Sequence, residues 1–267
     1  MALPPPAPDS TCLVTGASSG IGAEIARELA RRGRGVTLVA RREERLRELA
    51  DELAAAHAGR AEVVGASVAD HDGRAELAAE IERRGLTVET LVNNAGYGSA
   101  GRFQDLDPDG EEGMVRLNVE AVVGLCGMYA SRMGDRGRGA ILNVASIAAF
   151  QPLPYQATYA ASKSFVSSFS EALYVDLAGT GVTVTVLYPG LTRTEFDEES
   201  GMGSFDQLPS FLVDEPGDVA RAAVEGLEAG KRSVVPGAHN VIGALGGRFA
   251  PRSVLLPAFR RFYPFGR

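Results

Sequence analysis

The stretch Thr15-Gly16-Ala17-Ser18-Ser19-Gly20-Ile21-Gly22 ends an apolar, strand-like segment, Thr11–Thr15, and leads into a segment with helical periodicity. Glycine has no Cβ, so such a turn lets the backbone approach a ligand closely, and the following helix N-terminus favours an anion. No Lys-Ser or Lys-Thr follows the last glycine, which excludes a Walker loop. The spacing G-x-x-x-G-x-G after a first strand is typical of dinucleotide sites. We therefore expect Gly16, Ser18, Ser19, Gly20, Ile21 and Gly22 to bind the pyrophosphate of a dinucleotide.

Strand-like and helix-like segments alternate along the rest of the chain. The helix-like segments have apolar residues three or four apart, as Leu46, Leu49 and Leu53 are within Glu43–His57. This alternation predicts a parallel sheet covered by helices on both faces, with ligands at the carboxyl ends of the strands. We predict an α/β fold, a single-domain Rossmann-type doubly wound sheet. Its predicted strands are Thr11–Thr15, Val36–Ala40, Glu62–Ala66, Thr90–Asn93, Ala140–Val144, Val182–Tyr188 and Ser233–Val235.

The sequence predicts one folded unit with short appendages. Residues 1–9 are rich in proline and predict a disordered lead-in, whereas residues 10–247 carry the Rossmann pattern. Within that unit, residues 192–214 are acidic, contain glycine and serine, and lack a clear period. Such composition predicts a mobile substrate loop over the site. Residues 248–267 form a separate basic and aromatic tail.

The end of the second predicted strand indicates which dinucleotide binds. A site for NAD places an acidic residue there, which accepts hydrogen bonds from the ribose 2′-hydroxyl. This strand ends instead in Leu38-Val39-Ala40-Arg41-Arg42, so two guanidinium groups stand where a 2′-phosphate would lie. The alternative is a solvated helix N-terminus that happens to be basic, an arrangement that the helix dipole disfavours. We therefore predict NADP(H) as the cofactor, bound through Arg41 and Arg42.

A tyrosine and a lysine lie four residues apart in Tyr159-Ala160-Ala161-Ser162-Lys163, which places them on one face of a predicted helix. Tyrosine has an ordinary pKa of about 10 and is a poor acid–base catalyst at neutral pH. A nearby cation stabilises the phenolate and lowers that pKa. Ser146 follows the predicted strand Ala140–Val144, at the end where a ligand would bind. These residues predict a site that exchanges a proton with its substrate.

Taken together, these motifs resemble those of the short-chain dehydrogenase/reductase family, and they span almost the whole chain in the family's order. The matching residues are Thr15–Gly22, Asn93–Gly96, Leu117–Val119, Ser146, Tyr159, Lys163 and Pro189–Thr194. The resemblance implies an oxidoreductase that transfers hydride between a nicotinamide and a carbonyl or alcohol. It also implies a homodimer or homotetramer.

The resemblance assigns catalytic roles to four residues. Tyr159 would be the general acid in reduction and the base in oxidation. Lys163 would bind the nicotinamide ribose and lower the pKa of the tyrosine. Ser146 would donate a hydrogen bond to the substrate oxygen. Asn118 would hold a water that links Lys163 to solvent, although a polar residue inside a helix is the alternative interpretation.

The resemblance also assigns cofactor contacts. Asn94, Ala95 and Gly96 would line the adenine-ribose side, with Gly96 permitting close approach. Pro189, Gly190, Thr192 and Thr194 would contact the nicotinamide side. Two positions depart from the family pattern. An acidic residue often follows the third strand, but this chain has Ser67-Val68, so the Val68 backbone is the expected adenine contact. Ser19 replaces a basic residue before Gly20, so recognition of the 2′-phosphate depends on Arg41 and Arg42.

The basic tail leaves three interpretations open. Residues 248–267 contain five arginines and five aromatic residues, and Pro251, Pro257 and Pro264 prevent one long helix. The aromatic side chains would pack on the body or a sister subunit, anchor the protein peripherally on an anionic membrane, or form a collar for an acidic substrate.

Composition excludes several other classes of protein. The formal net charge of −7 argues against nucleic-acid binding. The two cysteines, Cys12 and Cys126, lie in apolar runs and predict reduced thiols, and the first eight residues lack the pattern of a secretory signal. No apolar run approaches the roughly 20 residues of a membrane span. The three histidines lack ligand spacing, so no metal site is expected. We therefore expect a cytoplasmic enzyme.

Two other functions compete with a carbonyl reductase. A sugar-nucleotide epimerase or dehydratase of the related extended type needs a substrate domain, for which the region after Pro189 is short. A non-catalytic NADP-sensing protein has no need of Asn118, Ser146, Tyr159 and Lys163 together. The predicted pocket walls, residues 97–103, 147–155 and 192–214, are apolar enough for a lipophilic ketone or alcohol.

Overall fold

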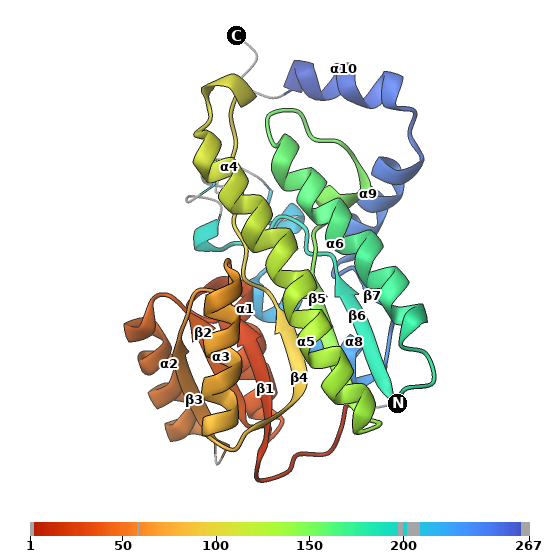
Figure 1. The fold of residues 1–267 in the computed structure, drawn as a ribbon. Coiled ribbons are helices and arrows are strands. Elements are labelled where there is room, and N and C mark those ends of the chain that lie inside the picture. The colour runs from red at the N-terminus through yellow and green to blue at the C-terminus, as the bar shows by residue number, and fades with distance from the viewer. Residues whose placement is uncertain (1–2, 58, 197–199, 202–208, 263–267) are drawn as a thin grey trace.

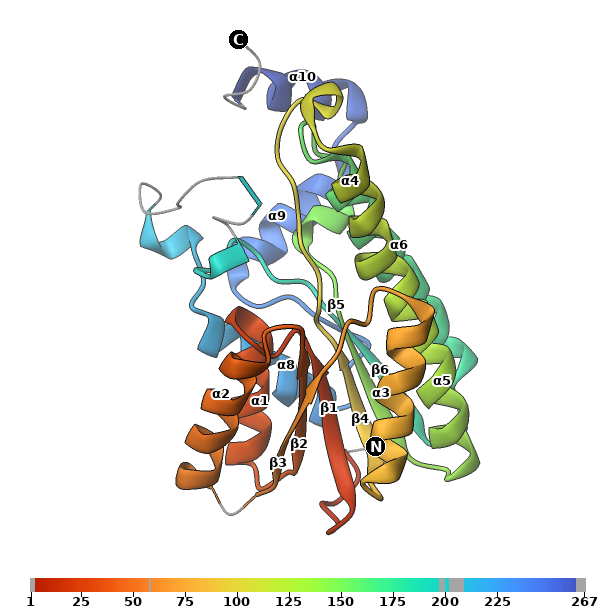
Figure 2. The same ribbon diagram turned by 60° about the vertical axis from the view of Figure 1, so that its left-hand side comes forward.

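The computed structural model describes residues 3–57, 59–196, 200–201 and 209–262. Seven parallel strands form one sheet in the order β3-β2-β1-β4-β5-β6-β7 (Figures 1 and 2). This confirms the predicted Rossmann-type fold. The strands are β1 (Ser10–Thr15), β2 (Val36–Ala40), β3 (Ala61–Gly65), β4 (Thr87–Asn93), β5 (Gly139–Val144), β6 (Val182–Leu187) and β7 (Ser233–Val234).

Helices cover both faces of the sheet. One face carries α1 (Gly20–Arg31), α2 (Glu43–Ala56) and α8 (Pro216–Glu228), and the other carries α3 (His71–Arg83), α5 (Ala121–Asp135) and α6 (Ala157–Asp176) (Figure 2). The remaining helices are α4 (Pro108–Val115), α9 (Ala238–Phe249) and α10 (Arg252–Phe262). Short turns of other helix types are η1 (Phe103–Asp105), η2 (Arg116–Glu120), η3 (Ile147–Phe150) and η5 (Ser210–Leu212).

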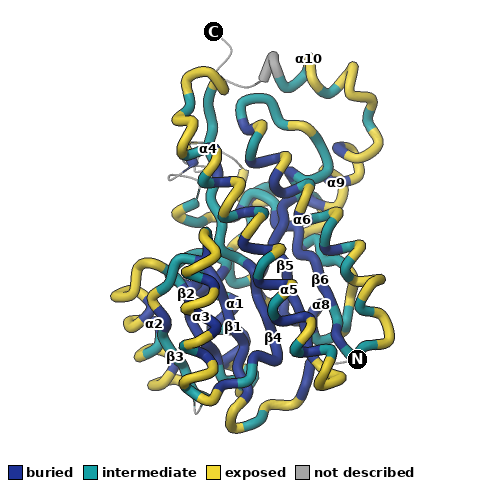
Figure 3. The backbone as a smooth tube through the Cα atoms, viewed as in Figure 1, coloured by how far each residue is buried: buried dark blue, intermediate teal, exposed yellow. Residues whose placement is uncertain are grey.

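Two apolar layers hold these helices on the sheet. Ile25 and Leu29, one helical turn apart on α1, pack into the layer on the first face. On the second face, Leu125 and Tyr129 of α5 do the same. All four are at most 2% exposed, and burial of each side chain contributes about 1.5–3 kcal/mol. Figure 3 shows the result, with buried strands inside and exposed residues on the outer sides of the helices.

The sheet order places a crevice at the carboxyl ends of β1 and β4. β1 pairs with β2 on one side and with β4 on the other, so the connections after β1 and β4 leave in opposite directions. Ligands of open α/β sheets bind at such a switch point. The glycine turn after β1 and the Asn93–Gly96 segment after β4 therefore meet there.

The N-terminal lead-in corrects an expectation. Residues 1–9 were predicted to be disordered, but Leu3 is 6% exposed and belongs to the core layer on the first face. The Arg34 guanidinium donates a hydrogen bond to the Pro4 carbonyl oxygen at 2.7 Å. Residues 3–9 are therefore attached to the domain. The proline-rich composition of this segment does not indicate that Leu3 packs into the core.

Strand bounds also differ slightly from the predicted ones, most at β4, which begins three residues earlier than expected. Glu89 interrupts the apolar pattern there, yet its side chain is buried and pairs with Arg138 at 2.7 Å. A charge inside a strand lowers its apparent strand propensity, and only the tertiary partner makes the burial possible.

The described part of the tail contains the end of α9 and the helix α10. α9 ends at Phe249 and α10 begins at Arg252, so the helical structure is interrupted at Pro251, as this proline predicts. Pro257, in contrast, lies inside α10 and does not end it. Pro264 lies outside the described residues.

Candidate active site

The glycine turn after β1 has the geometry of an anion site. Gly16 and Gly20 have φ values of +66° and +55°, a region that favours glycine. A Cβ on Gly22 would lie 2.4 Å from the Gly16 carbonyl oxygen, so the turn closes only because that residue is glycine. Ser19 occupies the N-cap of α1, but its side chain makes no capping hydrogen bond. The first N–H groups of α1 are thus available to a pyrophosphate.

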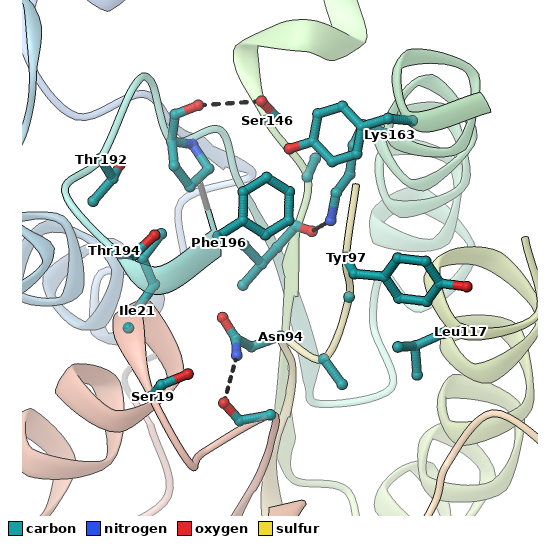
Figure 4. Close-up of a pocket in the computed structure, with 18 of the residues that line it drawn as sticks. Ser19, Ile21, Asn94, Tyr97, Leu117, Ser146, Lys163, Thr192, Thr194 and Phe196 are labelled. Carbon is teal, nitrogen blue, oxygen red and sulfur yellow. Dashed lines mark hydrogen bonds between the residues drawn. The ribbon is translucent and has the colours of Figure 1, made fainter. Parts of the chain in front are cut away.

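Thr15 and Asn94 join this turn to the end of β4. The Thr15 hydroxyl accepts hydrogen bonds from the Asn94 and Ala95 amides at 3.0 and 3.1 Å. The Asn94 Nδ2 donates to the Thr15 and Gly16 carbonyl oxygens at 3.0 and 3.2 Å. Figure 4 shows Asn94 facing the glycine turn across the floor of the pocket. Asn94 thus fixes the shape of the turn in addition to lining the pocket.

A cluster of guanidinium groups follows β2. Arg42 donates to the Ser19 hydroxyl at 2.9 Å and to the Glu195 carboxylate at 3.3 Å. Arg45, one turn further along α2, pairs with Glu195 at 2.6 Å. These arginines hold the pKa of the Glu195 carboxyl below its ordinary value, Arg45 more than Arg42. Sequence reasoning missed Arg45 and Glu195, because an ion pair spanning 150 residues leaves no local signal.

Tyr159, Lys163 and Ser146 meet at the other end of the crevice. Tyr159 and Lys163 lie in the first two turns of α6, with the Lys163 Nζ 5.8 Å from the centre of the Tyr159 ring. That ammonium donates to the Val144 carbonyl oxygen at 3.0 Å, and burial lowers the pKa of Lys163 to about 8. Ser146 caps η3 by accepting the Ala148 amide at 3.1 Å. Its hydroxyl also donates to the Pro189 carbonyl oxygen at 3.5 Å (Figure 4).

Asn118 lies behind these residues on η2, a single π-helical turn between α4 and α5. Such turns interrupt the regular helix ladder and often occur at functional sites. The Asn118 Nδ2 donates to the Tyr97 carbonyl oxygen at 2.9 Å and to the Ser162 hydroxyl at 3.1 Å, while its Oδ1 accepts the Tyr97 amide at 3.1 Å. A Cβ on Gly96 would lie 2.8 Å from the Asn118 Oδ1. The side chain of Asn118 therefore positions the Gly96–Tyr97 backbone beside Lys163.

One cavity of about 1330 Å³ connects the two ends of the site. Its walls include every residue that the sequence predicted for the site except Gly22 and Asn118, which support the walls from behind. The 18 predicted residues that line it are Gly16, Ser18, Ser19, Gly20, Ile21, Arg41, Arg42, Val68, Asn94, Ala95, Gly96, Ser146, Tyr159, Lys163, Pro189, Gly190, Thr192 and Thr194.

Val68, the residue predicted to contact the adenine, is held in place by a hydrogen bond to its carbonyl oxygen. The Val68 side chain is buried and lines the cavity, while its carbonyl oxygen accepts a hydrogen bond from Arg74 at 2.9 Å. Arg74 thereby fixes the segment after β3, where the family's acidic residue is absent.

The catalytic end of the cavity has apolar walls. Leu153 and Phe196 line it, and the Phe196 ring lies 5.5 Å from that of Tyr159. Phe259, from α10, also lines the cavity, so one aromatic side chain of the tail packs on the body of the same chain. Of the predicted wall segment 97–103, only Tyr97 lines the cavity, and Tyr155 does not.

The predicted substrate loop has a fixed base. Thr192 and Asp214 form an isolated parallel bridge, and the Asp214 amide donates to the Leu191 carbonyl oxygen at 2.8 Å. The buried Asn240 donates to the Asp214 carboxylate at 2.6 Å and so ties this base to α9. We call these three residues, Thr192, Asp214 and Asn240, the loop stem. Residues 197–199 and 202–208 of the loop lie outside the described residues.

The residues present fit a nicotinamide dinucleotide. The uncapped start of α1 suits a pyrophosphate, and the arginines after β2 suit a further anion. The cavity extends from them to Tyr159 and Lys163. Among the described residues there is no group of three or more histidine, cysteine or acidic side chains that could hold a metal ion. None of the described helices has both the length and the apolar character needed to cross a membrane.

Comparison with known proteins agrees with this geometry. A family model described as short chain dehydrogenase matches residues 10–203. Sulfoacetaldehyde reductase 2 of Chromohalobacter salexigens is 39% identical over 186 residues, which cover 69% of this chain and 73% of the reductase. A short-chain dehydrogenase from Sphingobium yanoikuyae, solved in complex with NADPH, is 33% identical with a TM-score of 0.79, covering 95% of this chain and 98% of that one. A 7β-hydroxysteroid dehydrogenase structure is 26% identical with a TM-score of 0.84, covering 97% of each chain.

Proposed function

Because this chain belongs to the short-chain dehydrogenase family, we propose that it is an NADPH-dependent oxidoreductase acting on a lipophilic ketone or alcohol. The observation that carries the proposal is the meeting of Tyr159, Lys163 and Ser146 at one end of a cavity whose other end is a dinucleotide site. When bound, the nicotinamide supplies or takes up the hydride. The chain itself supplies orientation, a hydrogen-bond donor and the proton.

In reduction, the Tyr159 hydroxyl gives its proton to the substrate oxygen as negative charge develops there. Lys163 stabilises the resulting phenolate, because its buried ammonium lies 5.8 Å from the centre of the Tyr159 ring. The Ala148 amide holds the Ser146 oxygen in place, and the single hydroxyl proton turns from the Pro189 carbonyl oxygen, 3.5 Å away, to the substrate oxygen when substrate binds. In oxidation the same proton returns to Tyr159.

The walls support a lipophilic substrate. Leu153 and Phe196 line the catalytic end of the cavity and Phe259 adds to its walls, and an apolar wall favours burial of an apolar substrate around one reacting oxygen. A panel of aliphatic, aromatic and steroid-like ketones, followed by loss of NADPH absorbance, tests this function. Turnover of at least one apolar ketone is expected, and turnover of only small charged aldehydes would contradict the substrate class.

The preference for NADPH rests on the arginines after β2. Replacing Arg42 by alanine removes a donor that already faces Ser18 and Ser19 of the glycine turn. Hydrogen bonds to charged groups contribute about 1.5–3 kcal/mol, so we expect the KM for NADPH to rise about tenfold or more. The KM for NADH should change little, because NADH has no 2′-phosphate. Steady-state kinetics with both cofactors measures this, and equal losses for the two would contradict recognition of the phosphate by Arg42.

Glu195 gives a second test of the same site. Its carboxylate pairs with Arg42 and Arg45, and a cofactor 2′-phosphate would compete for those guanidinium groups. Exposed ion pairs contribute at most about 1 kcal/mol, so Glu195→Gln should tighten NADP⁺ binding by about twofold to fivefold and leave NAD⁺ binding unchanged. Isothermal titration with NADP⁺ and NAD⁺ measures both.

Glu215→Gln is the matched control, because Glu215 pairs with Arg193 and not with the arginines of α2. It should leave both dissociation constants unchanged. Weaker NADP⁺ binding in Glu195→Gln would instead mean that Glu195 holds Arg42 and Arg45 in place for the phosphate.

A further inference from the structure

The outer face of α9 is apolar. Ile242, Leu245 and Phe249 follow one another at helical spacing and are 72%, 52% and 73% exposed. The face turned towards the body carries Asn240, Ala244 and Gly247, which are small or polar. A surface helix of a globular protein normally has the opposite arrangement, with its apolar stripe facing the core. The apolar stripe of α9 therefore needs a partner outside the described part of the chain.

Exposed apolar side chains continue onto the next helix. Val241 on α9 and Val254 and Leu256 on α10 are 41%, 61% and 42% exposed. We call the six side chains the α9–α10 surface: Val241, Ile242, Leu245, Phe249, Val254 and Leu256. Figures 1 and 2 show α10 at one end of the molecule, with α9 beside the segments after β5. Large exposed apolar groups gathered on two consecutive short helices mark an interaction site.

The part of the sequence that contains this surface is basic. From Ala229 to the end of the sequence there are seven basic and no acidic residues, although the whole chain carries −7. Arg248 is exposed beside the apolar stripe and forms no ion pair with a described residue. Arg252 is also exposed, but its guanidinium donates to the Gly247 and Phe150 carbonyl oxygens at 2.9 and 3.3 Å. The Arg248 guanidinium lies 5.8 Å from the centre of the Phe249 ring. The α9–α10 surface therefore combines apolar side chains with positive charge available to an anionic partner.

We propose that the α9–α10 surface binds the face of a membrane that contains anionic lipids. Helices that lie in a membrane interface present an apolar stripe to the acyl chains and arginine or lysine to the headgroups, which is the composition seen here. No spanning helix is needed for such binding. The aliphatic and aromatic side chains would enter the headgroup boundary, while Arg248 pairs with lipid phosphates.

The position of the surface favours a bilayer over a second copy of the chain. α10 also carries Phe259 in the cavity wall, and a Cβ on Gly247 of α9 would lie 2.6 Å from the side chain of Gln151, another wall residue. The two helices that carry the apolar surface therefore also contact the cavity, α10 through Phe259 and α9 by packing on Gln151. A bilayer bound to that surface would bring lipophilic molecules dissolved in the membrane close to the cavity. This advantage for substrate access rests on the proposed function.

Sedimentation with vesicles tests the proposal on the full chain. We expect the protein to co-sediment with phosphatidylcholine vesicles that contain phosphatidylglycerol, and only weakly with vesicles of phosphatidylcholine alone. Binding should weaken as sodium chloride is added, because salt screens the arginine–phosphate attraction. Failure to bind the anionic vesicles at low salt would overturn the proposal.

Variants separate the apolar and charged contributions. The triple variant Ile242→Gln, Leu245→Gln and Phe249→Gln should lower vesicle binding at least about tenfold, because it removes the side chains that enter the acyl boundary. Arg248→Gln should lower binding about fivefold, the loss expected for one charge at an anionic surface. Val175→Gln is the matched control, since Val175 is 68% exposed on α6, and it should bind as the unchanged protein does.

Two further readouts make each outcome decisive. Unchanged circular dichroism and unchanged NADPH oxidation with a water-soluble ketone show that the triple variant is folded. Unchanged vesicle binding by that folded variant would overturn the proposal. So would light scattering that shows a dimer separating into monomers in the triple variant, because a second copy would then be the partner. Vesicle binding needs no turnover, so an inactive protein that still binds vesicles would overturn only the proposed function.

Discussion

Replacing Tyr159 by phenylalanine should lower kcat about a thousandfold and leave the dissociation constant for NADP⁺ nearly unchanged. The substitution removes the hydroxyl that exchanges the proton, a contribution of about 10²–10⁴ in rate. It keeps the ring, which is 9% exposed and packs beside Phe196, so neither the wall nor the fold loses a contact of any size. Single-turnover kinetics with NADPH, together with titration of NADP⁺, measure the two quantities separately.

Tyr97→Phe is the control for this experiment. Tyr97 also lines the cavity, but its hydroxyl donates to the Gly110 carbonyl oxygen at 2.6 Å and points away from Lys163. Its loss should change kcat by a few fold at most. If Tyr159→Phe retained full turnover while Tyr97→Phe lost it, the proton would come from Tyr97 and the assignment of Tyr159 would be wrong.

Replacing Lys163 by methionine should abolish most turnover and yet stabilise the protein in the absence of cofactor. Methionine fills a similar volume but removes the cation beside Tyr159, so we expect kcat to fall by at least about a hundredfold. Burial lowers the pKa of Lys163 from 10.5 to about 8, which corresponds to a penalty on the order of 3 kcal/mol for the charged form. Losing the hydrogen bond to Val144 costs about 1 kcal/mol, so the net gain in unfolding free energy is about 2 kcal/mol at pH 7.

The pH dependence of this gain follows from the same shift. Below pH 8, Lys163 is protonated in both the folded and the unfolded chain, and the penalty is complete. Between pH 8 and 10.5 the folded protein has released this proton while the unfolded chain still binds it, so the stability contributed by Lys163 rises with pH. Urea denaturation of both proteins should therefore show a difference that is largest near pH 7 and shrinks towards pH 10. A less stable methionine variant at pH 7 would contradict a burial penalty at Lys163.

Much of the fold was predictable because its signals are local. The glycine turn lies within eight residues, and Tyr159 and Lys163 lie within five, so the spacing alone places them on one turn or one helix face. The alternation of short apolar runs with amphipathic segments then predicts parallel strands with helices between them. The sheet is where these patterns indicated, and 18 of the predicted site residues line one cavity.

The residues that sequence reasoning missed depend on contacts between distant segments. Phe259 lines the same cavity as Tyr159 although 100 residues separate them, and Glu195 pairs with Arg45 across 150 residues. Buried Glu89 is possible only because Arg138 pairs with it. Neither amino-acid composition nor hydrophobic periodicity reveals such pairs.

The helix α9 shows a second limit of prediction from the sequence. Periodicity identifies which of its residues share a face, and Ile242, Leu245 and Phe249 do share one. It does not say whether that face turns inward. The usual assumption buries an apolar stripe, whereas here Asn240 and Gly247 face the body, because Asn240 is needed to hold Asp214 and Gly247 leaves room for Gln151.

The loop stem has a consequence for how relatives of this chain diverge. Thr192 and Asp214 join the two ends of the loop to each other, and Asn240 ties that junction to α9. The two ends of the loop are therefore fixed independently of the residues between them. Thr194 and Phe196 line the cavity and Glu195 pairs with Arg42 and Arg45, so these three residues belong to the fixed part of the site. Selection can exchange the part of the chain between Phe196 and Asp214 as a unit, so relatives can differ there while Tyr159, Lys163 and the glycine turn are inherited unchanged.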